Sequence, residues 1–392
     1  MANPSFQHQI NQSAVFHYLL ESGPTYKNAI SQALGISLPS VTRALNALSD
    51  RGFVEHTENR KNKQSRVVPY YQATIKESLI IAIDLLYNTI MGSGLYEKYP
   101  IQQCDFITDK PLIENIQHYI DDYVKNTIKG DIKNIKSICI GSPGIVNVEK
   151  GYVETAIYHP TLENVPMKQE LSVIYDCSVF IENVVNLAAF ANYCQLSRKH
   201  SNIVACDVGA EIGAGLIINN AVYRGQNNIA GETGFFVDNL SRPSENYNEA
   251  CTLKSLLSRA VVARILPPEV DPERELPHKE FLERVQALFE LAHNGNLLAI
   301  DLIIDHVKSI ILMLNKIEIL LNPEMIFIGG DICSINHTEE LFLTPLNALY
   351  EPIRKMKDPV YYSAYGCDTT LQGACEMGLE KYLSQIFPYV LK

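Results

Sequence analysis

Apolar and polar positions alternate at helical spacing in three short stretches near the start of the chain. The first, residues 7–22, places apolar side chains about four positions apart and ends at Gly23-Pro24, because proline cannot continue a helix. A second helix is expected over residues 25–34, with Thr25 as its N-cap. A third is expected to open at Ser37, another good N-cap residue. Together they predict a small helical unit of the helix-turn-helix kind.

The third of these helices has one apolar side and one polar side. Val41, Leu45 and Leu48 are spaced to form a buried stripe. Short polar groups and a single arginine occupy the other faces, and such residues suit the major groove of DNA, where arginine can donate two hydrogen bonds to a guanine edge. The DNA-reading residues expected here are Ser37, Ser40, Thr42, Arg43 and Asn46.

A hairpin is predicted directly after the third helix. Residues 52–55 and 67–71 have the pattern of two strands, and the tip between them is basic. Cations at this position are placed to contact phosphates, as in the wing of a winged helix. The four are Arg60, Lys61, Lys63 and Arg66. The alternative is a three-helix bundle with a solvated charged loop.

Beyond residue 77 the pattern changes to strand-like runs that alternate with helical ones, which is typical of a mixed α/β body. Apolar strands are followed by glycine-rich turns in four places, where backbone amides could approach a ligand closely. The turns lie at residues 141–144, 209–215, 225–234 and 329–330. A long helical region is expected over residues 279–322, and a closing helix over residues 373–383.

Composition and charge refine this picture. The 392 residues are 46% hydrophobic, which is more than one core usually holds, so two or three domains are expected. Residues 1–72 hold seven Lys and Arg against four Asp and Glu, whereas the remainder holds 26 against 40. A small basic head on an acidic body favours a nucleic-acid partner for the head alone. The nine cysteines form no CxxC pair and are interpreted as free thiols.

The N-terminal residues lack the basic flank and apolar run of a signal peptide, and the longest apolar stretches contain charged residues. The expectation is a cytoplasmic protein with no membrane partner.

With these motifs in place, the body resembles the ROK family, which contains bacterial sugar kinases and related transcriptional repressors. The resemblance implies a two-lobed, actin-like and sugar-kinase-like α/β fold, and the winged helix-turn-helix in front of it is the repressor arrangement. The stretches that carry it are SPGIV at 142–146, LENVPM at 162–167, Glu182-Asn183, GAGLI at 213–217, and AGETG at 230–234.

Several departures from the family pattern argue against phosphoryl transfer. Kinases of the family open the body with Asp-x-Gly-Gly-Thr, but here Asp84 is followed by Leu-Leu-Tyr-Asn. Glu211 stands in place of a glycine in the second nucleotide loop. The catalytic segment reads Glu182-Asn183-Val184, so valine replaces the aspartate base, and loss of a general base typically costs ~10²–10⁴ in rate. The resemblance therefore implies a non-enzyme without catalytic residues or cofactors.

The family's zinc site is also expected to be absent. Zinc-binding members carry a histidine ligand and three cysteines after the AGETG signature, whereas this chain has Phe235 there and only Cys251 nearby. Four-coordinate zinc needs more ligands than this segment supplies. No metal is expected.

The resemblance implies a partly retained sugar site, more apolar and aromatic than a hexose site. Its expected effector-binding residues are Gly144, Tyr158, Glu182, Asn183, Glu232 and Phe235. Two alternatives stay open: Glu182 and Glu232 are paired in the core or on the surface, or the pocket has lost its ligand and the body only dimerises.

The resulting hypothesis has three segments: a DNA-binding head over 1–72, a first lobe over 77–200, and a second lobe over 201–392 whose last helix packs back on the first. The chain is expected to be a repressor of carbohydrate-utilisation genes. Its expected partners are double-stranded operator DNA and a sugar or sugar derivative. It is expected to form a homodimer or tetramer, with 279–322 and 373–383 as candidate contacts. A regulator controlled by a protein partner and a sugar kinase with a fused head are the alternatives.

Overall fold

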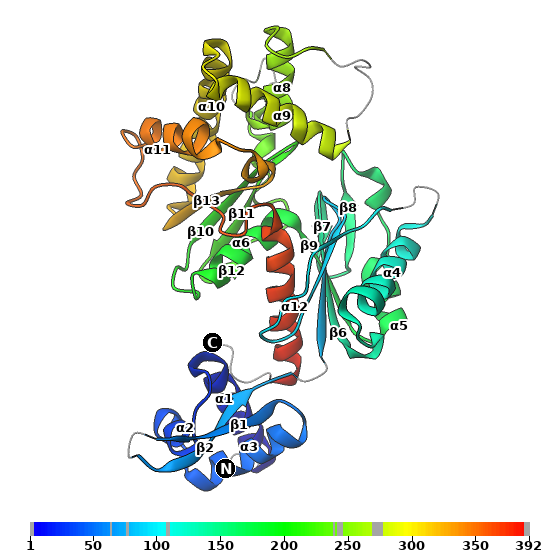
Figure 1. The fold of residues 1–392 in the computed structure, drawn as a ribbon, viewed down its shortest axis with the longest axis vertical. Helices are drawn as coiled ribbons and strands as arrows, with labels where there is room; N and C mark the ends of the chain where they lie inside the picture. Colours follow the sequence, from blue (N-terminus) through cyan, green and yellow to red (C-terminus); the bar gives the residue numbers. More distant parts are fainter. Residues whose placement is uncertain are drawn as a thin grey trace.

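The computed structural model describes residues 4–62, 65–75, 78–106, 110–237, 240, 246–268 and 277–387. It consists of a small head and a two-lobed α/β body (Figure 1). The fold class expected from the sequence is confirmed. Among the described helices, even the 25-residue α10 (Leu297–Leu321) lacks the uninterrupted apolar length of a membrane span.

The head is a winged helix-turn-helix. Its helices are α1 (Pro4–Ser22), α2 (Lys27–Leu34) and α3 (Leu38–Asp50), followed by the antiparallel strands β1 (Val54–Lys61) and β2 (Val67–Ala73). Ser37 caps α3 as expected, because its side chain accepts a hydrogen bond from the Ser40 amide. The N-cap prediction for Thr25 is wrong: α2 begins at Lys27, and Thr25 exchanges two backbone hydrogen bonds with Tyr71 of β2. Thr25, in the turn before α2, therefore pairs with β2 as a short third member of the wing sheet.

The first lobe is built on a five-stranded sheet in the order β5-β4-β3-β6-β9. Strands β3 (Leu79–Asp84), β6 (Ile135–Ser142) and β9 (Ser178–Asn183) run parallel, and β4 (Thr89–Ser93) and β5 (Gln102–Gln103) add antiparallel edges. Helices α4 (Leu112–Asp122) and α5 (Met167–Tyr175) contribute to its core, beside the hairpin β7 (Ile145–Asn147) and β8 (Tyr152–Thr155). The parallel strand ends Asp84, Ser142 and Asn183 therefore share one edge.

The second lobe repeats this plan with a sheet ordered β12-β11-β10-β13-β14. Its strands are β10 (Ile203–Val208), β11 (Ile212–Ile218), β12 (Ala221–Val222), β13 (Met325–Gly329) and β14 (Tyr361–Tyr362). Its helices are α7 (Tyr247–Cys251), α8 (Leu253–Val262), α9 (His278–His293), α10 and α11 (Thr344–Tyr350). The helical region expected over 279–322 is thus two helices, divided at Gly295, whose φ of 89° only glycine adopts readily.

Two helices lie between the sheets. α6 (Val184–Gln195) and α12 (Thr369–Ile386) share a core with residues of both sheets, such as Cys139 and Phe327. They approach so closely that a Cβ on Gly373 would lie 2.0 Å from the carbonyl oxygen of Leu187. One side of α12 is buried here, so a dimer contact over 373–383 stays a prediction that only its less buried residues, such as Lys381, could serve.

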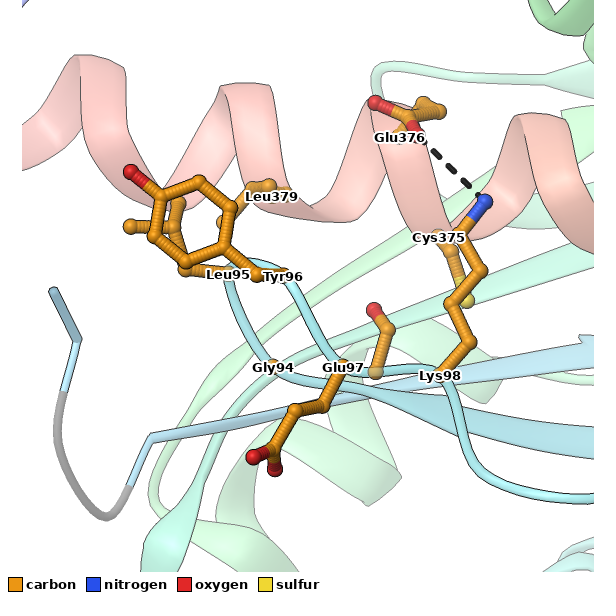
Figure 2. A pocket seen from close by; sticks show the side chains of 9 residues that line it. Gly94, Leu95, Tyr96, Glu97, Lys98, Cys375, Glu376 and Leu379 are labelled. Atoms are coloured by element: carbon orange, nitrogen blue, oxygen red, sulfur yellow. Dashed lines mark ion pairs between the residues drawn. The ribbon is translucent and has the colours of Figure 1, made fainter. Parts of the chain in front are cut away.

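α12 continues from the body down to the head (Figure 1). Phe387, which follows it, stacks on Phe16 of α1 with ring centroids 4.4 Å apart, and Leu383 belongs to the same core. The loop after β4 lies beside this helix, where Lys98 forms an ion pair with Glu376 and a small cavity separates loop and helix (Figure 2). Leu95 of the loop packs against the head core. The end of the body's last helix therefore forms part of the hydrophobic core of the head.

Candidate functional site

The polar side of α3 is exposed. Arg43 and Asn46 are open to solvent, and Ser40 and Thr42 are half-buried, while the opposite side of the helix is buried. The Ser40 hydroxyl lies 2.9 Å from that of Ser37 and 3.5 Å from an Arg43 guanidinium nitrogen. The expected reading residues thus lie together over the first turns of the helix, with Arg43 directed along its N-terminal half.

The wing carries fewer free charges than its sequence indicates. Arg60 forms an ion pair with Glu58 and lies over the ring of Tyr70, 5.6 Å from its centroid. Lys61 and Arg66 are exposed at the end of the hairpin. Lys63 lies outside the described residues. Lys61 and Arg66 are therefore better placed than Arg60 to contact phosphates.

A buried ion pair joins the two lobes, so of the alternatives left open by the sequence analysis the pairing of Glu182 within the protein holds, with a partner that was not named. Glu182 at the end of β9 is only 1% exposed, and Arg224 of the second lobe contacts its Oε2 through Nε, at 2.8 Å, and through Nη2. The other oxygen, Oε1, accepts from the Asn183 amide and from Asn186 Nδ2, both at 2.9 Å. Both oxygens expected to hold a sugar hydroxyl are thus engaged by the protein itself.

Asn183 and Gly144 are brought together directly beside this pair. Asn183 Nδ2 donates to the Gly144 carbonyl at 2.8 Å, and Asn183 Oδ1 accepts from the Val185 amide and so caps α6. Gly144 has a φ of 84°, and a Cβ there would lie 2.3 Å from the Thr155 carbonyl oxygen. The first turn of α6 is therefore tied to the glycine-rich turn of the first lobe.

Two of the remaining expected effector residues, Glu232 and Tyr158, are influenced by Glu211 instead. Burial, and secondarily the charge of Glu211, raises the pKa of Glu232. The same two causes raise the pKa of Tyr158, whose half-exposed ring lies 5.9 Å from the Lys254 ammonium. Phe235 is 51% exposed. His159 pairs with Glu211 at 3.4 Å, so this group also joins the two lobes.

A third contact between the lobes occupies the loop that binds phosphates in the related kinases. Asp84 is buried and accepts hydrogen bonds from the amides of Leu86 and Tyr87 at 2.8 and 3.3 Å. The Tyr87 ring packs on His278, with centroids 4.9 Å apart, and its hydroxyl is close enough to Asp331 for that carboxylate to help burial raise the pKa of Tyr87. His278 Nε2 lies 2.8 Å from Asp331 Oδ1. A tyrosine thus bridges the cleft at this position.

The electrostatics of this contact are dominated by buried carboxylates. Burial raises the pKa of Asp84 to about 6 and that of Asp207 to about 7, and the charge of nearby Asp331 adds to both shifts. A site that already resists carrying negative charge is unfavourable for a triphosphate. Sequence reasoning did not find His278 or Asp331, because each is defined by a partner far away in the chain. Arg224 did have a signal, since it directly precedes a glycine-rich turn.

Comparisons with known proteins agree with this architecture. Residues 80–377 match the model of the ROK family, and residues 9–74 match that of the sugar-specific transcriptional regulator TrmB. The xylose repressor of Caldicellulosiruptor bescii is 24% identical, with 88% of each chain covered. The glucokinase of Thermotoga maritima is 28% identical over 61% of this chain and 77% of its own. A crystal structure of a ROK family transcriptional regulator, a homologue of the Escherichia coli MLC protein, superposes with a TM-score of 0.73 at 19% identity, covering 98% of both chains.

Proposed function

This chain belongs to the ROK family, and we propose that it is a DNA-binding transcriptional repressor whose body responds to a sugar or sugar derivative. One observation carries the proposal: the winged head, with Arg43 and Asn46 exposed on α3, is packed directly against Phe387 at the end of the body's last helix. The xylose repressor matches across both the head and the body, which favours a carbohydrate effector and carbohydrate genes. A repressor acts on the chromosome, so the proposal places the protein in the cytoplasm.

We further propose that the body has no kinase activity. Val184 begins α6 at the position of the family's aspartate base and cannot accept a proton. Tyr87 fills the first phosphate loop and contacts Asp331. With base and phosphate loop both changed, little of what phosphoryl transfer requires is left.

The proposed coupling between effector and DNA follows the two central helices. A ligand at Gly144 and Asn183 would act on the first turn of α6, which packs along α12, and α12 ends in the head core. An effector that releases DNA must bind the free form more tightly than the DNA-bound form. Two heads in a homodimer would read two half-sites. The exposed apolar residues Leu312, Ile319 and Leu320 of α10 are candidates for the dimer contact.

The first test is a binding measurement with operator DNA selected from random duplexes by the purified full-length protein. Arg43→Ala should weaken binding to the selected duplex by about 5- to 150-fold and relax the preference at one base pair, because a bidentate arginine–guanine contact is worth about 1–3 kcal/mol. Lys61→Ala should weaken binding to all sequences alike and reduce the salt dependence by about one phosphate contact. Lys125→Ala, at an exposed lysine of the first lobe, is the control. Unchanged binding by Arg43→Ala would remove α3 as the reading helix.

The second test adds D-xylose, glucose, amino sugars, phosphosugars or ATP to the same complex and to the free protein. A sugar that raises the melting temperature and releases DNA would support the sensor. Turnover of ATP would support the kinase alternative. A protein that binds DNA but ignores every sugar would support control by a protein partner.

A further inference from the structure

Two histidines and two glutamates converge in the second lobe, away from the cleft. His293 Nδ1 lies 3.2 Å from Glu340 Oε2, and His337 Nε2 lies 3.4 Å from Glu290 Oε1. The two imidazole rings stack at 3.7 Å with planes 11° apart. Candidate ligand atoms of His293, His337 and Glu340 all lie within 4.8 Å of one another. Two chain segments far apart in sequence thus bring three candidate ligand atoms near one another, with Glu290 beside His337. Because the stacked rings direct their nitrogen lone pairs along parallel planes, at least one ring must rotate for both to bind the same ion.

The spacing of these residues along the chain places their side chains close together. Glu290 and His293 are three residues apart in the last turns of α9, so they share one side of the helix. His337 and Glu340 have the same spacing in the opposite order, at the turn that starts the segment Glu339–Leu343. His337 adopts a left-handed φ of 65°, which few non-glycine residues do.

Neighbouring polar groups orient the cluster. Gln286 Nε2 donates to Glu290 Oε1 at 2.8 Å, and Gln286 Oε1 accepts from the Asn336 amide at 2.8 Å. The same glutamine therefore holds one candidate ligand and the backbone beside another. Groups that fix the orientation of ligands in this way are characteristic of metal sites.

We propose that His293, His337, Glu340 and Glu290 bind a divalent transition-metal ion, with Zn²⁺ as the best match. Imidazole nitrogen and carboxylate oxygen are borderline and hard donors that zinc accepts in four-coordinate sites at about 2.0–2.2 Å. The side chains are 28–66% exposed, so they are free to close the remaining distance by rotation. As two separate surface ion pairs the groups would contribute little stability. The expectation of no metal was drawn from the segment around Phe235, and this site uses other residues.

The position of the site gives the metal a structural role. The segment after β13 runs alongside α9 and touches it at His278–Asp331, at Gln286–Asn336 and at the cluster. A metal would fasten the far end of this contact and so hold His278 against Asp331 in the cleft. Metal binding would therefore stabilise the second lobe and bias the cleft toward its present arrangement.

The test is a titration of metal-free full-length protein with ZnCl₂ by calorimetry, and with CoCl₂ by visible absorption. One equivalent should bind, and the intense d–d absorption of tetrahedral Co²⁺ should appear. His293→Ala and His337→Ala should each weaken binding at least tenfold, and the double variant should lose the stoichiometric site. Melting temperatures without metal show whether each variant is folded.

The matched control is His200→Ala, because His200 pairs with Glu324 at 3.1 Å and has similar exposure, but among the described residues no second histidine forms a metal-ligand group with it. Its affinity should equal that of the wild type. Three results would overturn the proposal: no one-to-one binding by the wild type, binding that survives in the double variant, as exposed Cys367 would produce, or equal loss in His200→Ala.

Discussion

The two lobes of the body meet in two places of opposite chemistry. Between the sheets, α6 and α12 form an apolar seam that buries residues such as Leu187, Leu371 and Ala374. Elsewhere the contacts that join the two lobes are polar: Glu182–Arg224, His159–Glu211 and Tyr87–Asp331. Apolar burial is non-directional and has no competitor in water, whereas each polar contact can be exchanged for hydroxyls of a ligand. The apolar seam is thus suited to act as the axis of a hinge between the lobes. The polar contacts are its adjustable side, the side of this hinge that a ligand can open or close.

The largest effect is expected from breaking the seam. A methyl group on Gly373 would lie 2.0 Å from the Leu187 carbonyl oxygen, so Gly373→Ala must separate α6 from α12. We expect a loss of roughly 3–5 kcal/mol in the free energy of unfolding, above the usual cost of overpacking because the obstacle is backbone. Denaturant unfolding measures it. The control is Gly94→Ala in the loop of Figure 2, where the nearest atom to the new Cβ is 3.9 Å away. Equal stability of both variants would contradict the seam as the axis.

The second largest effect on stability is expected from removing the ion pair between Glu182 and Arg224. Arg224→Ala leaves the buried Glu182 carboxylate without its cation, and we expect a loss of roughly 2–4 kcal/mol, reduced from the value for fully buried pairs because Arg224 is 27% exposed. The double variant Glu182→Gln/Arg224→Ala should recover part of this loss, since no unpaired charge remains. Additive losses in the double-mutant cycle would show that the two residues do not act as a pair.

The same contrast explains what could be predicted from sequence. The head helices, the Ser37 cap and the hairpin depend on neighbours within a few residues, and they were predicted closely. The strands around the cleft followed from apolar runs and glycine turns. A paired Glu182 was one of the alternatives left open, but its partner could not be predicted, because Arg224 is 42 residues away. The return of the last helix to the first lobe was expected, but its packing against α6 and the head was not, because a helix pattern predicts a buried side but not which elements cover it.

A third prediction concerns how the stability of the fold depends on pH through the buried Asp84. Burial raises the pKa of Asp84 from 3.8 to about 6, so ionising it in the folded state is unfavourable. Its contribution to stability is therefore greatest below about pH 4 and is lost as the pH rises through about 6, an effect of roughly 3 kcal/mol. Asp84→Asn keeps an acceptor for the Leu86 and Tyr87 amides but buries an unpaired amide group. We expect a net gain of about 1–2 kcal/mol at pH 8 and a flatter stability profile. The profile is measured by denaturant unfolding from pH 4 to 8, and Asp305→Asn, at an exposed site on α10, is the control.

The smallest effect is expected from the tyrosine that bridges the cleft. Tyr87→Phe removes the hydroxyl that contacts Asp331 but keeps the ring on His278, so the loss should be about 1 kcal/mol, the net value of one hydrogen bond. Urea unfolding measures the loss, and under the proposed absence of kinase activity the variant should show no ATP turnover, because Val184 is unchanged. If this contact belongs to the adjustable side of the hinge, the variant should also need less sugar effector to release DNA than the wild type. A loss as large as that of Gly373→Ala would make the cleft contact as structural as the seam, and the proposed division between axis and adjustable side would fail.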